Sequence, residues 1–326
     1  MKLLIIIISI YCIFLLNSCG TDPDLEGVDF KREMKSFVHE LSVYAKNLDS
    51  NFIIIPQNGQ ELLTENGEED GPPDLTYINA IDGQGREDFY YGYNRDNKAT
   101  PDRETDYMKK YLDIGYSNGV VIMVTDYCSD HEKMDDSYSK NNNNHYISFA
   151  ANSRELDRIP DYPASIYNEN ADSIGNLSEA ENFLYLINPE RYSSKNEYIQ
   201  TIASTNYDVL LMDYFFGDGE EFTSEEITEL KNKANGGKRL VVSYMSIGEA
   251  EDYRFYWKSS WKKGNPGFIY DENPDWEGNY KVKYWDDEWK DIIFGTGNSY
   301  LDKIINKGFD GTYLDIIDAF EYFEDL

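Results

Sequence analysis

Eight short apolar runs, rich in β-branched and aromatic residues, place the strongest limit on how this chain can fold. They occupy residues 52–56, 77–81, 120–124, 146–150, 183–187, 208–212, 239–243 and 311–314. The runs are continuously apolar rather than alternating, as strands covered on both faces of a parallel sheet require. Eight such strands predict an α/β fold, a closed (β/α)8 TIM barrel.

Helical patterns lie between several of these runs. Asp29 can cap a helix whose apolar side chains recur through residues 30–48. Thr223 and Glu226 form a capping box before a second helix. Further helices are expected at 104–116, at 195–203, and in two pieces within 286–307.

Two ranges, 126–144 and 152–181, lack a helical period, and we expect long loops there that shape the active-site face. The last apolar run is followed only by residues 315–326, too few for the helix that should cover it. The helix that begins at Asp29 can take that place, because the two ends of a barrel chain lie close together. The sequence therefore predicts a circularly permuted barrel, whose chain begins on a helix and ends just after a strand.

The first residues have the features of a secretory signal. A charged start precedes an apolar run over residues 3–16, which is too short to cross a hydrocarbon core of ~30 Å. The sequence that ends at Cys19 resembles the lipobox of bacterial lipoproteins, in which the cysteine becomes the lipidated first residue. We therefore expect a signal peptide at 1–18, a short acidic tether at 19–28 and a single domain at 29–326.

The expected location is the cell envelope, where the protein would face the periplasm or the cell surface. The lipid anchor would be its only contact with the membrane. Cleavage by an ordinary signal peptidase is the alternative, and it would leave a free secreted protein. Once the signal is removed, only Cys19 and Cys128 remain, and the first carries lipid, so no intramolecular disulfide is expected.

The chain is strongly acidic, because 61 Asp and Glu residues against 30 Lys and Arg give a formal net charge of −31. This charge repels phosphate backbones and disfavours nucleic-acid binding. A neutral or cationic partner fits better, although an acidic surface also keeps an exported protein soluble. His39, His131 and His145 are scattered without metal-ligand spacing, and no phosphate-binding glycine loop occurs. We therefore expect a monomer without metal or cofactor.

Barrel enzymes carry their reactive groups at the carboxyl ends of the strands. Seven acids follow predicted strands closely: Asp82, Asp126, Asp213, Glu249, Glu251, Asp315 and Asp318. Any one of them could instead cap a helix or bind solvent. Hydrolysis of a glycosidic bond needs one protonated carboxylic acid and one carboxylate, and close carboxylates push their pKa values apart. Amides such as Asn58 could bind sugar hydroxyls, and aromatic side chains such as Trp285 could stack on sugar rings.

Four motifs stand out in the second half of the chain. They are VSYMSIGEAEDYR at 242–254, ENPDW at 272–276, YWD at 284–286 and GFDGTYLDIID at 308–318. These motifs resemble those of glycoside hydrolase family 114, and the segments at 52–59 and 81–88 resemble the other half of that family. The two halves stand in swapped order, which agrees with the predicted permutation. The resemblance implies an extracellular endo-α-1,4-polygalactosaminidase on a (β/α)8 barrel.

Together with the strand ends, the resemblance implies site residues. Glu251 and Asp315 would be the catalytic pair. Substrate contacts would come from Asp213, Glu249, Asp318, Arg254, Tyr313, Trp285, Asn58 and Asp82. The implied substrate is a galactosamine-containing polysaccharide, which is cationic where it is not acetylated and would be drawn to an acidic cleft.

Tyr313 departs from the family pattern. In part of the wider family an acid is expected two positions before the residue that matches Asp315, and here that position holds Tyr313. Two alternatives therefore stay open. One is a surface glycan-binding lipoprotein without turnover, and the other is a barrel hydrolase of a different glycan.

Overall fold

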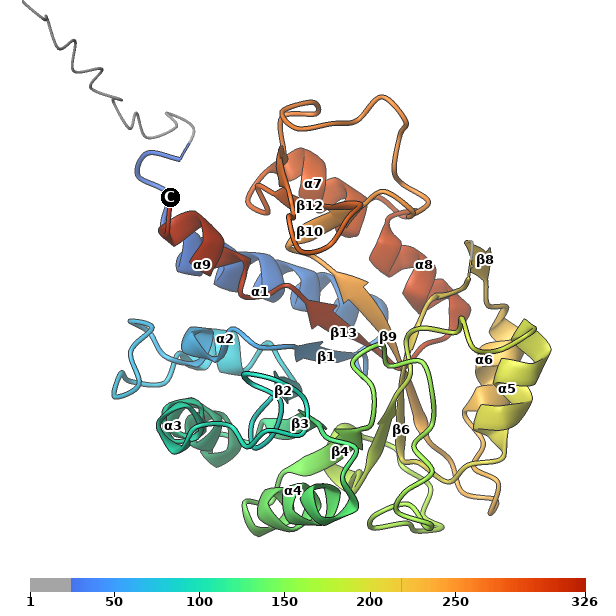
Figure 1. The fold of residues 1–326 in the computed structure, drawn as a ribbon. Helices are drawn as coiled ribbons and strands as arrows, with labels where there is room; N and C mark the ends of the chain where they lie inside the picture. The colour runs from blue at the N-terminus through green and yellow to red at the C-terminus, as the bar shows by residue number, and fades with distance from the viewer. Residues whose placement is uncertain (1–24, 218) are drawn as a thin grey trace, which may run out of the picture.

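The computed structural model describes residues 25–217 and 219–326 (Figure 1). The predicted signal peptide, the predicted lipidation site at Cys19 and most of the predicted tether lie outside these residues. Among the described helices, none is both long enough and apolar enough to cross a membrane.

Parallel strands form the centre of the described part, in two sheets (Figure 1). The larger sheet has the order β1 (Ile53–Pro56), β13 (Gly311–Asp315), β9 (Leu240–Ser246), β6 (Val209–Asp213) and β5 (Phe183–Tyr185). The smaller sheet has the order β2 (Gly83–Glu87), β3 (Val121–Tyr127) and β4 (Ile147–Ala151). All neighbours within these two sheets pair in parallel. The structure confirms an α/β fold with a central parallel sheet.

The two sheets meet at both of their edges. At one edge, a parallel bridge joins Gln57, just after β1, to Gly85 in β2. At the other edge, the rings of Phe149 in β4 and Phe183 in β5 lie 5.8 Å apart, but no ladder pairs these two strands in the described residues. The Tyr185 hydroxyl of β5 donates to Gln57 Oε1 at 2.9 Å, so strands far apart in the order share one interior. Full closure of the barrel and the permutation stay predictions.

Helices lie around the outside of these strands (Figure 1). They are α1 (Phe30–Leu48), η1 (Gln60–Leu63), α2 (Leu75–Ile78), α3 (Asp102–Ser117), α4 (His131–Asn143), η2 (Leu177–Glu179), α5 (Lys195–Ala203), α6 (Ser224–Leu230), α7 (Asp287–Ile293), α8 (Tyr300–Lys307) and α9 (Ala319–Glu324). The Asp29 side chain caps α1, and the capping box of Thr223 and Glu226 begins α6, as predicted. The four other predicted helices correspond to α3, α5, α7 and α8.

Short antiparallel strands complete the elements. They are β7 (Phe215–Phe216), β8 (Glu220–Glu221), β10 (Glu249–Glu251), β11 (Ile269–Glu272) and β12 (Asn279–Val282). The last three form a sheet of their own, with the order β10-β12-β11, in the segment that follows the carboxyl end of β9.

The strand predicted at 77–81 is wrong. Residues 75–78 form α2, where Asp74 accepts a hydrogen bond from Tyr77 N at 3.1 Å, and the strand follows as β2. β2 escaped prediction because glycine, which gives no apolar signal, occupies two of its five positions. A Cβ at Gly85 would lie 2.1 Å from the Tyr313 hydroxyl, and one at Gly83 would lie 2.8 Å from Leu177.

The loop predicted at 126–144 is also wrong, because α4 occupies most of it. The buried side of α4 includes Ser137 and Asn141, which bind the buried carboxylate of Asp126, so the helix lacks a clear apolar period. The other predicted loop, 152–181, is irregular apart from the short η2, as expected.

We expected no room for a helix after the last parallel strand, but the short helix α9 follows β13. The short helix α9 buries Phe320 and Phe323. α1 packs beside it, with the rings of Phe30 and Phe323 5.5 Å apart and an ion pair between Lys31 and Glu324. The two ends of the described chain are therefore neighbours.

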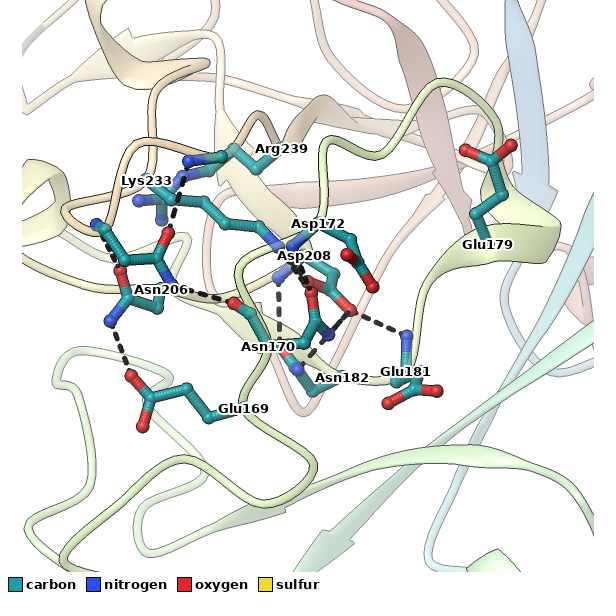
Figure 2. A network of polar contacts seen from close by, with 12 residues as sticks. Glu169, Asn170, Asp172, Glu179, Glu181, Asn182, Asn206, Asp208, Lys233 and Arg239 are labelled. Carbon is teal, nitrogen blue, oxygen red and sulfur yellow. Dashed lines mark hydrogen bonds and ion pairs between the residues drawn. The ribbon is translucent and has the colours of Figure 1, made fainter.

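A buried ion pair closes the amino-terminal edge of the sheet (Figure 2). Asp208 directly precedes β6, and its carboxylate pairs with Lys233 in a position where both side chains are fully buried. Asp208 Oδ2 also accepts from Asn170 Nδ2 at 2.9 Å and from Glu181 N at 2.8 Å. These bonds tie the long irregular segment 152–182 to the sheet.

Candidate active site

Asp315 stands at the carboxyl end of β13. Its Oδ2 accepts a hydrogen bond from the Tyr244 hydroxyl at 2.6 Å, and Tyr244 lies on the neighbouring strand β9. Burial and the nearby Glu87 carboxylate raise the pKa of Asp315 to about 7, against the effect of the Tyr244 hydroxyl. Asp315 can therefore hold a proton near neutral pH.

Glu87 stands at the carboxyl end of β2. Its Oε2 accepts from Gln57 Nε2 at 2.6 Å and from Asn58 Nδ2 at 3.2 Å, while the Tyr127 hydroxyl donates to Oε1. The side-chain oxygen of Asn58 also accepts from Glu87 N at 3.2 Å, so one amide fixes both the backbone and the carboxylate. In the described residues, three side chains thus donate hydrogen bonds to the two oxygens of Glu87.

Sequence reasoning missed Glu87. The strand predicted at 77–81 puts Asp82 at the carboxyl end of the second strand, a position that Glu87 occupies in the structure. Asp82 instead precedes β2, and its Oδ2 accepts from Ile54 N at 2.9 Å and pairs with Lys46 at 3.0 Å. Asp82 therefore lies at the amino-terminal edge of the strands, away from Asp315. The signal that could have found Glu87 is the glycine alternation in the sequence GQGRE, which is typical of a strand packed against large side chains.

Two buried tyrosines, Tyr185 and Tyr313, lie close to both acids. Tyr313 is completely buried, its ring is 5.3 Å from that of Tyr185, and its hydroxyl points over Gly85. No hydrogen-bond partner for that hydroxyl occurs in the described part of the chain. The predicted substrate contact at Tyr313 therefore lies below the surface that a substrate could reach.

A second group of acids surrounds Arg254. The guanidinium binds Glu251 through Nε at 2.6 Å, and it binds both oxygens of Asp213 at 2.8 Å. The Tyr253 hydroxyl donates to Glu251 Oε1 at 2.5 Å. Asp213 and Glu251 are thus ion-paired carboxylates, and Glu251 is only 1% exposed.

Tyr244 lies between the two groups. Burial, then the charges of Asp315 and Glu251, raise its pKa well above the usual range. Besides burial, the Glu87 carboxylate raises the pKa of Asp315, whereas the Glu251 carboxylate is paired with Arg254. The pairing of Glu251 with Asp315 stays a prediction, and Glu87 is a second candidate for the partner of Asp315.

Asp318 lies just behind the site, before α9. Burial raises its pKa to about 6, opposed by the guanidinium of Arg86 and supported by Glu87 and Glu61. Arg86 itself donates to Gln60 Oε1 at 2.9 Å. Asp318 thus belongs to a layer of polar side chains that backs the site.

Two other predicted substrate contacts are occupied by internal packing. Glu249 is 1% exposed and accepts from Asn273 Nδ2 at 2.8 Å, from Asn279 Nδ2 at 3.3 Å and from Lys281 Nζ at 3.1 Å. It holds the small antiparallel sheet together and does not face the acids. Trp285 packs with the rings of Phe30, Tyr284 and Phe323 at 5.3, 4.9 and 4.9 Å.

A clamp holds the loop that follows Glu87. The Arg154 guanidinium lies 4.0 Å above the ring of Tyr127, and it pairs with Asp88 at 2.6 Å and Asp96 at 2.5 Å. Burial raises the pKa of Asp88 to about 6, against the effect of Arg154. Tyr127 donates a hydrogen bond to Glu87, so Arg154 holds in place a side chain that contacts Glu87.

Within the described residues, no group of three or more His, Cys, Asp and Glu side chains is arranged to hold a metal ion. The site instead combines two carboxyl groups, Asp315 and Glu87, at the carboxyl ends of parallel strands. Acid–base hydrolases built on parallel α/β folds use the same combination.

The comparison with known proteins narrows this class. Residues 177–326 match the model of glycoside hydrolase family GH114. This segment runs from η2 to the end of the chain and includes Asp213, Glu251, Arg254 and Asp315, while Glu87 lies outside it. The second half of the chain thus resembles a glycoside hydrolase.

Individual relatives add sequence similarity without a stated activity. The chain is 47% identical over 156 residues to an uncharacterized protein of Methanocaldococcus jannaschii, a match covering 47% of this chain and 42% of the relative. It is 45% identical over 131 residues to an uncharacterized protein of Thermotoga maritima, covering 40% and 39% of the two chains. The chain therefore spans about two fifths of the length of these relatives.

Proposed function

We propose that this protein is a glycoside hydrolase in which Asp315 is the general acid and Glu87 is the ionised carboxylate. The observation that carries the proposal is the pair itself, since one carboxyl group has a pKa raised to about 7 and its neighbour faces three donors. Glycoside hydrolysis needs these two protonation states side by side.

In the proposed reaction, Asp315 gives its proton to the glycosidic oxygen as the bond from that oxygen to the anomeric carbon breaks. Glu87 meets the positive charge that develops on the anomeric carbon, either by attacking it or by taking a proton from an attacking water. Proton NMR of the first-formed anomer separates these two routes, because the first retains and the second inverts the configuration.

The substrate that we propose is an α-1,4-linked polysaccharide that contains galactosamine and is cut within the chain. Support comes from the family match of residues 177–326 and from the net charge of −31, which attracts a cationic polymer. Asp213, which is partly exposed and is positioned by Arg254, would bind sugar hydroxyl or amine groups beside the acid pair.

The test uses purified protein without its first 18 residues and a panel of glycans that includes partly deacetylated galactosaminogalactan. Release of reducing ends should fall at least about 100-fold in Asp315→Asn and in Glu87→Gln. Asp82→Asn, at the opposite edge of the strands, should retain activity and serves as the matched control.

Two outcomes would replace the proposal. Tight glycan binding without any release of reducing ends would favour a surface glycan-binding protein. Cleavage of a different glycan in the panel, lost in the same two variants, would keep the chemistry and change the substrate.

We also propose that the protein is anchored in the cell envelope through lipid on Cys19. Cells that express the full chain should incorporate labelled palmitate into it, and Cys19→Ala should abolish the label. Cys128→Ser should keep the label, because Cys128 is a buried residue of the domain. A labelled Cys19→Ala variant would contradict the anchor.

A further inference from the structure

Exposed aromatic side chains gather in one part of the molecule. In the described residues, five aromatic side chains are strongly exposed: Tyr93, Tyr116, Tyr253, Phe255 and Trp276. The last three, exposed by 60%, 42% and 65%, all lie in the segment 247–285 that carries β10, β11 and β12. Trp276 is the most exposed of all. Large aromatic rings are costly to leave in water, so their concentration in one segment calls for a ligand.

This segment is continuous with the acid site. It leaves the carboxyl end of β9, and its first strand ends in Glu251. The exposed Tyr253 keeps its hydroxyl on Glu251 at 2.5 Å, and the Arg254 guanidinium lies 5.1 Å from its ring. The exposed ring of Tyr253 is therefore next to the polar side chains of Glu251 and Arg254.

The turn that carries Trp276 is held from inside. The buried carboxylate of Glu249 binds both Asn273 and Asn279, one on each side of Trp276. Asn273 Oδ1 accepts from Asp275 N at 3.1 Å, which tightens the same turn. Burying a charge costs free energy. Here the buried carboxylate of Glu249 fixes a turn that exposes Trp276.

Backbone contacts bring this turn next to Tyr253. Asp252 N donates to Gly278 O at 2.9 Å, so the residue before Tyr253 is bonded to the residue two positions after Trp276. Gly278 has a φ of +87°, in the left-handed region that favours glycine, so glycine permits this turn. The two exposed rings therefore stand on adjoining segments at the rim of the site.

Four exposed acids lie near the two rings in the sequence. Asp252, Glu272, Asp275 and Glu277 are all exposed, and they flank Tyr253 or Trp276 in the sequence. Rings combined with carboxylates suit a sugar that carries an ammonium group, because the ring packs on the sugar face and the acids attract the charge.

We propose that Tyr253 and Trp276 form an aromatic rim that binds additional amino-sugar units of the glycan chain, next to the units held at Asp315 and Glu87. The inference rests on the proposed function, because it names the partner of the same site. The occupant is a glycan chain rather than a protein, since the rim continues directly from the carboxylates at Glu251 and Asp213.

Binding is measured without turnover, in Asp315→Asn protein, by calorimetry with long and short partly deacetylated oligosaccharides. Trp276→Ala should weaken binding of the long oligosaccharide at least about tenfold, on the scale of a lost stacking contact. It should leave binding of a short oligosaccharide unchanged. Tyr116→Ala, which removes an exposed aromatic side chain on α3, is the matched control and should change neither.

Equal weakening for short and long chains would overturn the rim, and so would no weakening for either. A wild-type dimer that becomes a monomer in Trp276→Ala would show that a second copy covers the rim instead. Acetylation of the oligosaccharide should remove the contribution of Asp275 and Glu277, so Asp275→Asn with Glu277→Gln should weaken binding of the deacetylated form only. If the wild-type protein does not hydrolyse glycans but this pattern holds, the proposed catalysis fails and the rim stands.

Discussion

Asp315 and Glu87 are neighbouring carboxyl groups with different surroundings. Asp315 receives one side-chain hydrogen bond, from Tyr244, and is otherwise set in a poorly solvated position. Glu87 receives three, from Gln57, Asn58 and Tyr127. Pairs of acids whose environments push them toward opposite protonation states can divide the tasks of acid and base.

The Tyr244 hydroxyl should set the alkaline limit of activity. It stabilises ionised Asp315, so Tyr244→Phe should raise the pKa of Asp315 above its value of about 7. Because the proton donor then survives to higher pH, the fall of kcat/KM at alkaline pH should move upward, by somewhat less than about one unit for a bond of ~1 kcal/mol.

The control for this shift is Tyr313→Phe, whose hydroxyl has no partner in the described residues. That variant should leave the alkaline limit in place. A downward move of the limit in Tyr244→Phe would contradict the assignment of Asp315 as the acid.

Arg154 should act on Glu87 through Tyr127. Arg154→Gln removes the stacked cation and the ion pairs with Asp88 and Asp96, so Tyr127 should hold Glu87 less firmly. We expect kcat to fall roughly 10- to 100-fold with little change in KM, as for a misplaced reacting group. Arg154→Lys should recover part of kcat. Arg158→Gln, which breaks an ion pair with Asp157 away from Tyr127, should keep kcat near the wild-type value.

Among the elements, β2 shows best what the sequence can and cannot reveal. Seven of the eight apolar runs coincide with strands, because side chains covered on both faces must be apolar. β2 has no such signature, since Tyr313 from another strand fills the space over Gly85. The position of Asp315 followed from its own strand, whereas that of Glu87 depended on a residue more than two hundred positions away.

α4 shows the same limit for a helix. Its capping residue, Asp130, is a usual start signal, but half of its buried positions are polar. Ser137 and Asn141 are buried because Asp126 needs their hydrogen bonds, and this need arises only in the folded chain. A local sequence pattern cannot show a partner that folding brings from elsewhere.

Gly85 should tolerate no side chain. Gly85→Ala would place a methyl group 2.1 Å from the Tyr313 hydroxyl, so the free energy of unfolding should fall by about 1–3 kcal/mol. Urea unfolding followed by tryptophan fluorescence measures the loss. Gly267→Ala, which meets nothing within 4 Å, is the control and should unfold as the wild type does.

The ion pair of Asp208 and Lys233 should stabilise the amino-terminal edge only as a pair (Figure 2). Lys233→Met would leave a buried carboxylate without its cation, so unfolding should become easier by about 3–5 kcal/mol. The double variant with Asp208→Asn should recover part of this loss. Lys238→Met, at an exposed position, should cost little, and an equal cost in both lysine variants would contradict the role of the pair.

The whole molecule is organised as two groups of strands. α1 and β1 to β4 come from the first part of the chain, and the strands from β5 onward come from the part that matches family GH114. The β1–β13 ladder joins the two parts, and so do the contacts of α1 with α9. Between β4 and β5, the irregular segment 152–182 makes the covalent connection.

Cutting this segment should not separate the two parts. A protease site placed within 158–166, before the residues that bind Asp208, should yield two fragments that remain together in size-exclusion chromatography without denaturant. The reason is that the ladder and the α1–α9 contacts do not involve the cut residues. Fragments that elute apart would show that the connection is needed for the fold. A cut within 40–44 of α1, a continuous buried helix, should unfold the protein.

The segment 152–182 has one more consequence, for how such a protein could be assembled. Parallel strands arranged around a shared interior have no inherent first strand, so only the connections decide where a polypeptide starts. If the two fragments associate when made separately, this connection is dispensable, and two genes could supply one active centre. Glu87 and Asp315 would then belong to different polypeptides, and measured hydrolysis would show that the two fragments had associated.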